Sequence, residues 1–232
     1  MGKLKRMSNI TYRRGQAEWA LWQLARSGRP GARASIPPEF LARIKKLLDL
    51  DRGHARKELA AKEQAFADAG RERASRDAEF ESFDVFCLAV ALDLVDAGFL
   101  QTEAIELVRT CRSQLHDEFE WIVEHYPPVT RARRLAKDHP DLPFYEENGA
   151  CIADTSVYMI TRKIALTETL VKKSPSAAIV APHFADGRAA LAQTLSLSPL
   201  ARSALVIEIA GTAKLIEGFL ARAPRITRAR KN

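Results

Sequence analysis

The chain has 232 residues, 47% of them hydrophobic, and a formal net charge of +7. This length and apolar content allow a sizeable buried core, and no apolar run approaches the ~20 residues of a membrane-spanning helix. The N-terminus is basic but lacks the apolar segment of a signal peptide, so we expect a cytoplasmic protein. The three cysteines, Cys87, Cys111 and Cys151, lie far apart in the sequence, which argues against a disulfide framework.

Positive charge is concentrated at the start of the sequence. Residues 1–57 hold 14 basic and 4 acidic side chains, whereas residues 77–125 hold 2 basic and 12 acidic ones. A concentrated basic segment is typical of polyanion binders, since each neutralised phosphate releases condensed counterions. There are two alternatives. The basic segment could be an ordinary solvated surface, or its charge could be compensated within the chain by the acidic segment.

Two helices are predicted in the basic region. Residues 11–28 carry apolar side chains at helical spacing, and a second helix is predicted to start at Pro37 and Pro38, because proline in the first turn costs no hydrogen bond. The apolar side chains of this second helix lie on one side, which should face a core. The residues on that side are Phe40, Leu41, Ile44, Leu47 and Leu48.

Basic side chains of this region are the candidate DNA contacts. Two helices joined by a turn can lay the second in a major groove while the first crosses the backbone. The second helix would contribute Arg43, Lys45 and Lys46, and the first Arg13 and Arg14. The alternative is an amphipathic surface helix whose lysines keep it soluble. The first half of segment 51–82 is expected to extend the helix, and the pattern loosens around Gly70. Three arginines there could follow phosphates as a wing, or belong to a disordered linker; they are Arg71, Arg73 and Arg76.

A second pair of helices is predicted between residues 83 and 122. Residues 83–97 are apolar on nearly every side, which predicts a buried helix, and Gly98 then permits a turn. Thr102 is the predicted N-cap of the following helix, with Glu103 in its first turn. The inner face of that helix should consist of Ile105, Leu115, Phe119 and Ile122.

The order of these elements is a basic helix pair, an irregular Gly/Arg segment, a leucine-rich helix that ends in DAGF, and then QTEAI. Residues 11–122 thereby resemble the MerR-type winged helix-turn-helix transcriptional regulators. The matching residues are Leu94, Gly98, Phe99, Glu103 and Ile105. The resemblance implies a regulator that binds double-stranded DNA, as a homodimer if the operator is two-fold symmetric.

Three regions are expected along the chain. Residues 1–125 would form the DNA-binding domain with its second helix pair, residues 126–153 a proline-interrupted linker, and residues 154–232 a small α+β regulatory or dimerisation domain. Strands are predicted from Asp154 and within residues 176–184. Ser198 and Pro199 predict the start of a long C-terminal helix, although β-branched residues at 206 and 207 leave a strand followed by a helix open. The chain ends in a basic tail.

No pattern of catalytic or metal-binding residues is recognisable. The five histidines are scattered, without C-x-x-C or H-E-x-x-H spacing, so neither a metal nor a cofactor is predicted, and we expect no enzyme. The charged run His116, Asp117, Glu118 and Glu120 is interpreted as a solvated helix face. The hypothesis is a mostly α transcriptional regulator with a MerR-like N-terminal domain and a small α+β C-terminal domain. The alternative is a protein-binding adaptor whose acidic helix pair docks a partner; a small-molecule effector is left open.

Overall fold

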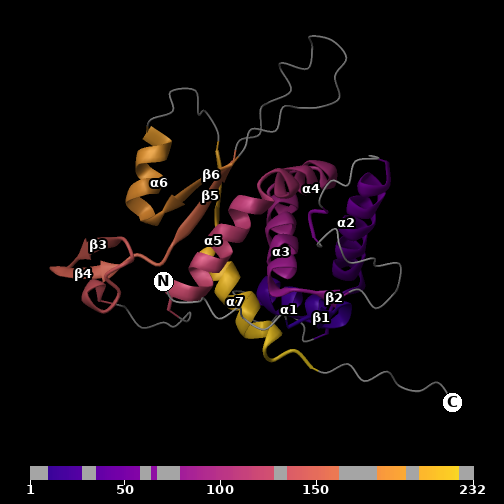
Figure 1. Cartoon of the computed structure of the whole chain (residues 1–232), viewed down its shortest axis with the longest axis horizontal. Coiled ribbons are helices and arrows are strands. Elements are labelled where there is room, and N and C mark those ends of the chain that lie inside the picture. Colours follow the sequence, from indigo (N-terminus) through magenta and orange to yellow (C-terminus); the bar gives the residue numbers. More distant parts are fainter. Residues whose placement is uncertain are drawn as a thin grey trace, which may run out of the picture. The chain divides into compact units, whose positions relative to one another are not determined.

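The computed structural model of the chain is mostly helical, as predicted (Figure 1). In the described part of the chain, no helix is both long and apolar enough to cross a membrane. Two units are distinguished, residues 1–89 with 216–232 and residues 90–215. The structure describes residues 10–27, 35–57, 64–66, 79–127, 135–161, 182–196 and 204–224.

The first unit contains helices α1 (Arg14–Arg26) and α2 (Pro38–Lys57). Helix α2 starts at the predicted prolines. Helix α1 starts later than predicted, because strand β1 (Tyr12–Arg13) takes up extended backbone and pairs antiparallel with strand β2 (Glu79–Phe80). This short ribbon ties the start of α1 to a segment that lies far along the sequence.

Aromatic contacts hold the core of the first unit together. The ring of Trp22 packs against Phe40 of α2 with centroids 5.3 Å apart, and Trp19 meets Phe219 edge-on at 6.4 Å. Phe219 lies near the end of helix α7 (Ala210–Leu220), and the part of this helix from residue 216 onward belongs to the first unit. The predicted inner side of α2 is confirmed by the burial of Ile44, Leu47 and Leu48.

One buried carboxylate fixes the segment that follows α2. Asp51 is almost fully buried, and its carboxylate accepts hydrogen bonds from the backbone N–H groups of Ala65 and Phe66, at 3.1 and 3.3 Å. Both of these residues are themselves fully buried. The wing arginines predicted at 71, 73 and 76 lie outside the described residues.

Helix α3 (Ser82–Asp96) is buried on nearly all sides, as predicted. It ends where the sequence predicted a glycine turn. The N–H of Phe99 donates to the carbonyl of Leu94 and that of Gly98 to Val95, both at 3.0 Å, while Gly98 adopts a φ of +93°. This pair of bonds satisfies the last carbonyls of the helix and needs a residue that tolerates positive φ.

The helix predicted over residues 102–122 is divided in two. Helix α4 (Gln101–Thr110) and helix α5 (Arg112–His125) meet at Cys111, whose backbone leaves helical geometry. The prediction of Thr102 as N-cap is wrong, because the helix already begins at residue 101 and the Glu103 carboxylate accepts the N–H of Leu100 at 2.8 Å. The predicted inner face is confirmed by the burial of Ile105, Leu115, Phe119 and Ile122.

A three-stranded antiparallel sheet lies in the second unit. Its order is β6–β5–β7, with β5 (Val157–Thr161) between β6 (His183–Asp186) and β7 (Leu205–Glu208). The strand predicted from Asp154 is confirmed at β5, and β6 overlaps the second predicted strand. Residues 162–181 lie outside the described residues.

The C-terminal helix is shorter than predicted. Val206 and Ile207 belong to β7 and pair with Ile160 and Met159 of β5, so α7 starts only at Ala210. β-Branched side chains fit a half-buried sheet better than the start of a helix. The prediction of a helix from Ser198 is therefore wrong, and the strand followed by a helix is the observed arrangement.

The predicted linker, residues 126–153, contains a β-hairpin and a short 3-10 helix (Ala136–Asp138). Strands β3 (Phe144–Glu147) and β4 (Ala150–Ala153) are joined by Asn148 and Gly149, both with positive φ. Two residues with positive φ make a turn whose twist matches that of the flanking strands. Helix α6 (Gly187–Ser196) then follows β6 directly.

Gly187, between β6 and α6, should tolerate no side chain. It has a φ of +80°, and a Cβ there would lie 3.0 Å from the Pro143 ring and 3.1 Å from the Asp154 carboxylate. We expect Gly187→Ala to lower the free energy of unfolding by about 2–4 kcal/mol, from backbone strain together with crowding. Gly149→Ala is the matched control, because Gly149 also has a positive φ but no atom within 4 Å. Urea unfolding of the two variants measures the difference, and equal losses would contradict the tight packing.

Candidate functional site

Helix α2 carries three of the eight predicted DNA contacts, and two more stand at the start of α1. Arg43 is half-buried, whereas Lys45 and Lys46 are exposed. Arg13 is exposed immediately before α1, and Arg14 is the first residue of that helix. The three predicted wing arginines are outside the described residues, so the structure brings together only part of the predicted set.

Carboxylates of the same helices neutralise several of these cations. The Lys45 ammonium lies 3.2 Å from the Asp49 carboxylate, and Arg52 reaches the other oxygen of Asp49 at 2.9 Å. Arg14 pairs with Glu18 at 2.7 Å. Each pair joins residues three or four apart, so the basic face carries less uncompensated charge than the sequence count indicates.

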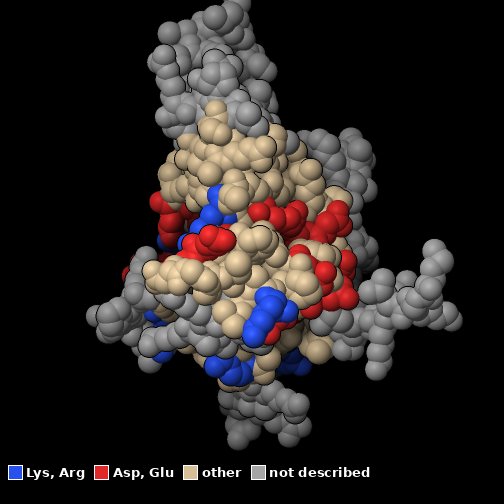
Figure 2. Space-filling model, turned by 90° about the vertical axis from the view of Figure 1, so that its left-hand side faces the viewer, with Lys and Arg blue, Asp and Glu red and all other residues tan. Residues whose placement is uncertain are grey.

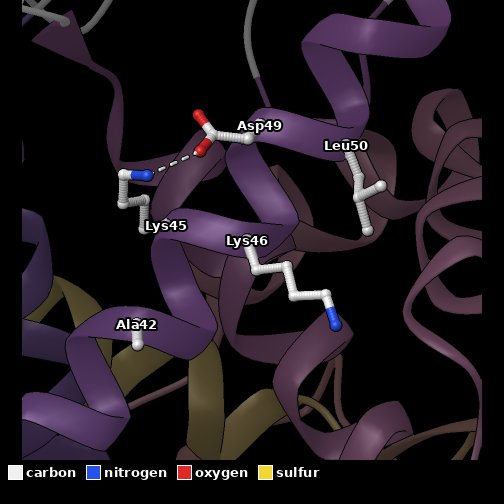
Figure 3. A pocket seen from close by; sticks show the side chains of 5 residues that line it. All are labelled: Ala42, Lys45, Lys46, Asp49 and Leu50. Atoms are coloured by element: carbon white, nitrogen blue, oxygen red, sulfur yellow. Dashed lines mark ion pairs between the residues drawn. The ribbon is translucent and has the colours of Figure 1, made fainter.

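Lys46 extends away from this ion pair. Figure 3 shows its ammonium directed to the side opposite Asp49, along a hollow of about 350 Å³ beside α2. As far as the described residues show, Lys46 makes no ion pair. The hollow is lined by Ala42, Lys45, Lys46, Asp49 and Leu50.

A second concentration of charge lies at one end of the sheet in the second unit. Because β5 runs antiparallel to both neighbours, its first residues lie beside the last residues of β6 and β7. Val157 pairs with Asp186, and Tyr158 pairs with Glu208. Asp154 stands just before β5. The antiparallel register therefore gathers three carboxylates from distant parts of the sequence at one sheet end.

Two of these carboxylates cap helices. Asp154 is buried and accepts the N–H of Arg188 in the first turn of α6 at 2.7 Å, and that of Ser156 at 3.2 Å. Glu208 accepts the N–H groups of Ala210 and Gly211 at the start of α7, at 2.9 and 3.0 Å. A carboxylate at a helix N-terminus satisfies N–H groups that the helix leaves unpaired. Both acids thus have a structural role.

Helix α5 contributes a further carboxylate, Glu118, whose pKa is raised. Burial, followed by the nearby carboxylates of Asp186 and Asp117, raises the pKa of Glu118 to about 7. Burial also raises the pKa of Asp186. Among the described residues, neither Glu118 nor Asp186 has a hydrogen-bonding or ion-pairing partner.

Tyr126, at the end of α5, lies beside the same carboxylates. Its side chain is 4% exposed, and its hydroxyl has no hydrogen-bond partner in the described part of the chain. Burial and the charges of four carboxylates raise the pKa of this phenol. In order of effect, they belong to Asp186, Glu118, Asp154 and Glu208. Together with Tyr126 they are called the sheet-end cluster below.

Two described cations of the second unit, Lys214 and Arg188, have other contacts. The Lys214 ammonium donates to the Val123 carbonyl at 2.6 Å, and the Arg188 guanidinium lies 4.5 Å over the ring of Tyr145. The described residues contain no group of three or more His, Cys, Asp or Glu side chains placed to hold a metal ion. Within the described residues, the cluster is therefore anionic.

Sequence reasoning treated the acids of α5 as one solvated face. Asp117 and Glu120 are exposed, as is His116, which lies 3.7 Å from Glu120. Glu118, however, is half-buried. Helical spacing could have predicted this difference, because Glu118 lies one turn from both Leu115 and Ile122 of the inner face. Its neighbour Asp186 follows only from the fold.

Comparisons with known proteins give no relative. No family model, no curated protein and no solved structure matches this chain.

Glu118 should make stability depend on pH. Its pKa is about 7 in the folded chain against an ordinary value of 4.5, so its contribution is most favourable below pH 4.5 and is lost as the pH rises through 7. Glu118→Gln removes this titration. We expect the variant to gain more stability over the wild type at pH 8 than at pH 5, as measured by urea unfolding at both pH values.

Glu146→Gln on β3 is the control, because it removes an exposed carboxylate from the same unit. Its effect should be small at both pH values. An equal effect of Glu118→Gln at pH 5 and pH 8 would show that Glu118 is ionised like an ordinary surface acid.

Proposed function

We propose that the chain is a DNA-binding protein and that the outer side of α2 contacts phosphates. The observation that carries the proposal is the two-sidedness of this helix. Ile44, Leu47 and Leu48 are buried on one side, while Lys45 and Lys46 are exposed on another. A helix anchored by an apolar side presents its cations in a fixed orientation, as contact with a regular backbone requires.

The ion pair between Lys45 and Asp49 does not prevent such contact. Both side chains are about half exposed or more, and an exposed pair of this spacing contributes only about 0.3–0.5 kcal/mol. A phosphate can therefore replace Asp49 at small cost. Lys46 needs no such exchange, since its ammonium already points away from Asp49 (Figure 3).

The finer proposal is a homodimeric MerR-like transcriptional regulator, with Arg71, Arg73 and Arg76 as wing contacts. It is supported by the sequence resemblance and by the roles of the residues that carry it: Leu94 and Gly98 end a buried helix, and Glu103 stands in the first turn of the next. Residues 27–37 separate α1 from α2, which is longer than the turn of a helix-turn-helix. The proposal therefore rests on α2 for DNA contact and does not require α1 to cross the backbone.

Charge reversal on α2 tests DNA binding. We expect the double variant Lys45→Glu/Lys46→Glu to weaken binding to random-sequence duplex. The slope of log K against log[salt] should become less negative by about 2, roughly 0.9 per lost phosphate contact. Gel shifts over a series of salt concentrations measure the slope.

Lys137→Glu is a control for charge reversal, because Lys137 is exposed in the second unit. It should leave the slope unchanged. An unchanged slope in the double variant would remove α2 from the interface, and no retention of duplex by the wild type at the lowest salt would reject DNA binding.

A second candidate function is protein docking, and the exposed side of α5 favours it. Asp117, Glu120, Trp121 and Glu124 lie at helical spacing and are all exposed. Figure 2 shows acidic side chains gathered in groups on one face of the molecule. A large exposed aromatic ring among carboxylates is suited to a basic protein partner, because aromatic residues are enriched in interfaces and opposite charges steer association.

A further inference from the structure

One carboxylate on α2 holds two cations at once. The Oδ2 atom of Asp49 lies 3.2 Å from Nζ of Lys45, and its Oδ1 atom lies 2.9 Å from Nη2 of Arg52. Residues spaced by four and then three positions lie on the same side of a helix, so the three side chains form one row along α2. Both oxygens of Asp49 are therefore engaged by side chains that could otherwise bind a phosphate.

Arg52 is a cation of this row that the sequence prediction did not include. Its Nε atom donates to the carbonyl of Leu48 at 3.2 Å, and its Nη2 atom donates to Asp49. These two contacts hold the guanidinium against α2, and a guanidinium has more N–H donors than the two contacts use. The side chain is 43% exposed. Arg52 can therefore offer paired N–H groups to a phosphate from a fixed position.

The two adjacent lysines of α2 differ in their relation to Asp49. Lys45 reaches toward the carboxylate, whereas the ammonium of Lys46 points away from it (Figure 3). Both lysines and Asp49 nevertheless line the same hollow beside the helix. A phosphate that enters this hollow therefore meets the negative charge of Asp49 as well as the two ammonium groups.

Solvent exposure makes an exchange of partners feasible. The side chains of Lys45 and Asp49 are 65% and 48% exposed, and exposed ion pairs at this spacing are weak. Carboxylate and phosphate oxygens accept the same N–H groups of lysine and arginine. A phosphate can therefore take the place of Asp49 on both cations, and the carboxylate competes with it until the exchange is complete.

We propose that Asp49 is an internal competitor of phosphate on α2, and that Arg52 belongs to the contact surface together with Lys45 and Lys46. The inference rests on the proposed contact between α2 and DNA. In the free protein Asp49 occupies Lys45 and Arg52, and on the duplex phosphate oxygens replace it on both. The affinity of α2 for duplex is thereby lower than its three cations alone would give, which limits non-specific retention on DNA.

Neutralisation of Asp49 tests the competition. Asp49→Asn keeps the size of the side chain and removes its charge. We expect the full chain with this change to bind random-sequence duplex about three- to tenfold more tightly than the wild type. The slope of log K against log[salt] should become more negative by about 1, because one more positive charge faces the phosphates. Gel shifts over a series of salt concentrations measure both quantities.

Glu39→Gln is the matched control, because Glu39 is an exposed acid in the first turn of the same helix and the change in net charge is equal. It should alter the affinity by less than about twofold. Arg52→Gln should weaken binding and make the slope less negative by about 1. In the background of Lys45→Gln/Arg52→Gln, Asp49→Asn should lose most of its effect, because no cation is left to release. Urea unfolding verifies that each variant is folded.

Each contrary outcome overturns a distinct part of the inference. Equal gains from Asp49→Asn and Glu39→Gln would reduce the effect to net charge and reject competition. Weaker binding by Asp49→Asn would show that the carboxylate orients Lys45 and Arg52 for phosphate instead of competing with it. An unchanged slope for Arg52→Gln would remove this residue from the contact surface. All three results leave DNA contact by α2 standing, whereas no retention of duplex by the wild type at the lowest salt rejects both.

Discussion

The antiparallel pairing of β5 with both β6 and β7 is the constraint on which the second unit depends. Val157, Met159 and Thr161 alternate along β5 and are all buried, so a slip of one residue would move these side chains to the opposite face of the sheet. With the register fixed, the ends of β6 and β7 must meet the start of β5. Two helices leave this sheet end, and each begins on a carboxylate that the register has placed there. The sheet, the caps and the acid pair are therefore one structural arrangement.

Local patterns in the sequence predicted the elements that depend on local physics. The apolar α3, the turn at Gly98 and the start of α2 at Pro38 all follow from side-chain spacing and backbone preference within a few residues. The hairpin in the predicted linker was missed although its signal was present, because Asn148 and Gly149 are the residue types that a two-residue hairpin turn requires. Prolines that precede this turn interrupt helices, and they favoured the prediction of a linker.

Of the two candidate sites, one could be predicted from local sequence and the other depends on tertiary structure. The cations of α2 could be found from charge alone, and the pairing of Lys45 with Asp49 was also accessible, because acid and base stand four residues apart on one helix. Glu118 and Asp186 are separated by the whole hairpin and two strands. No periodicity connects them, and the effect of Asp186 on Glu118 follows only from the tertiary structure.

Burial decides how differently the two charged sites respond to solvent. The lysines of α2 are exposed, so their attraction to a polyanion is screened by salt and is driven largely by the release of counterions. Glu118 is half-buried, and part of its interaction with Asp186 passes through a medium that salt reaches poorly. Its charge is governed by pH more than by ionic strength. The field of the α2 lysines therefore depends mainly on ionic strength, whereas the charge of Glu118 depends on protonation near neutral pH.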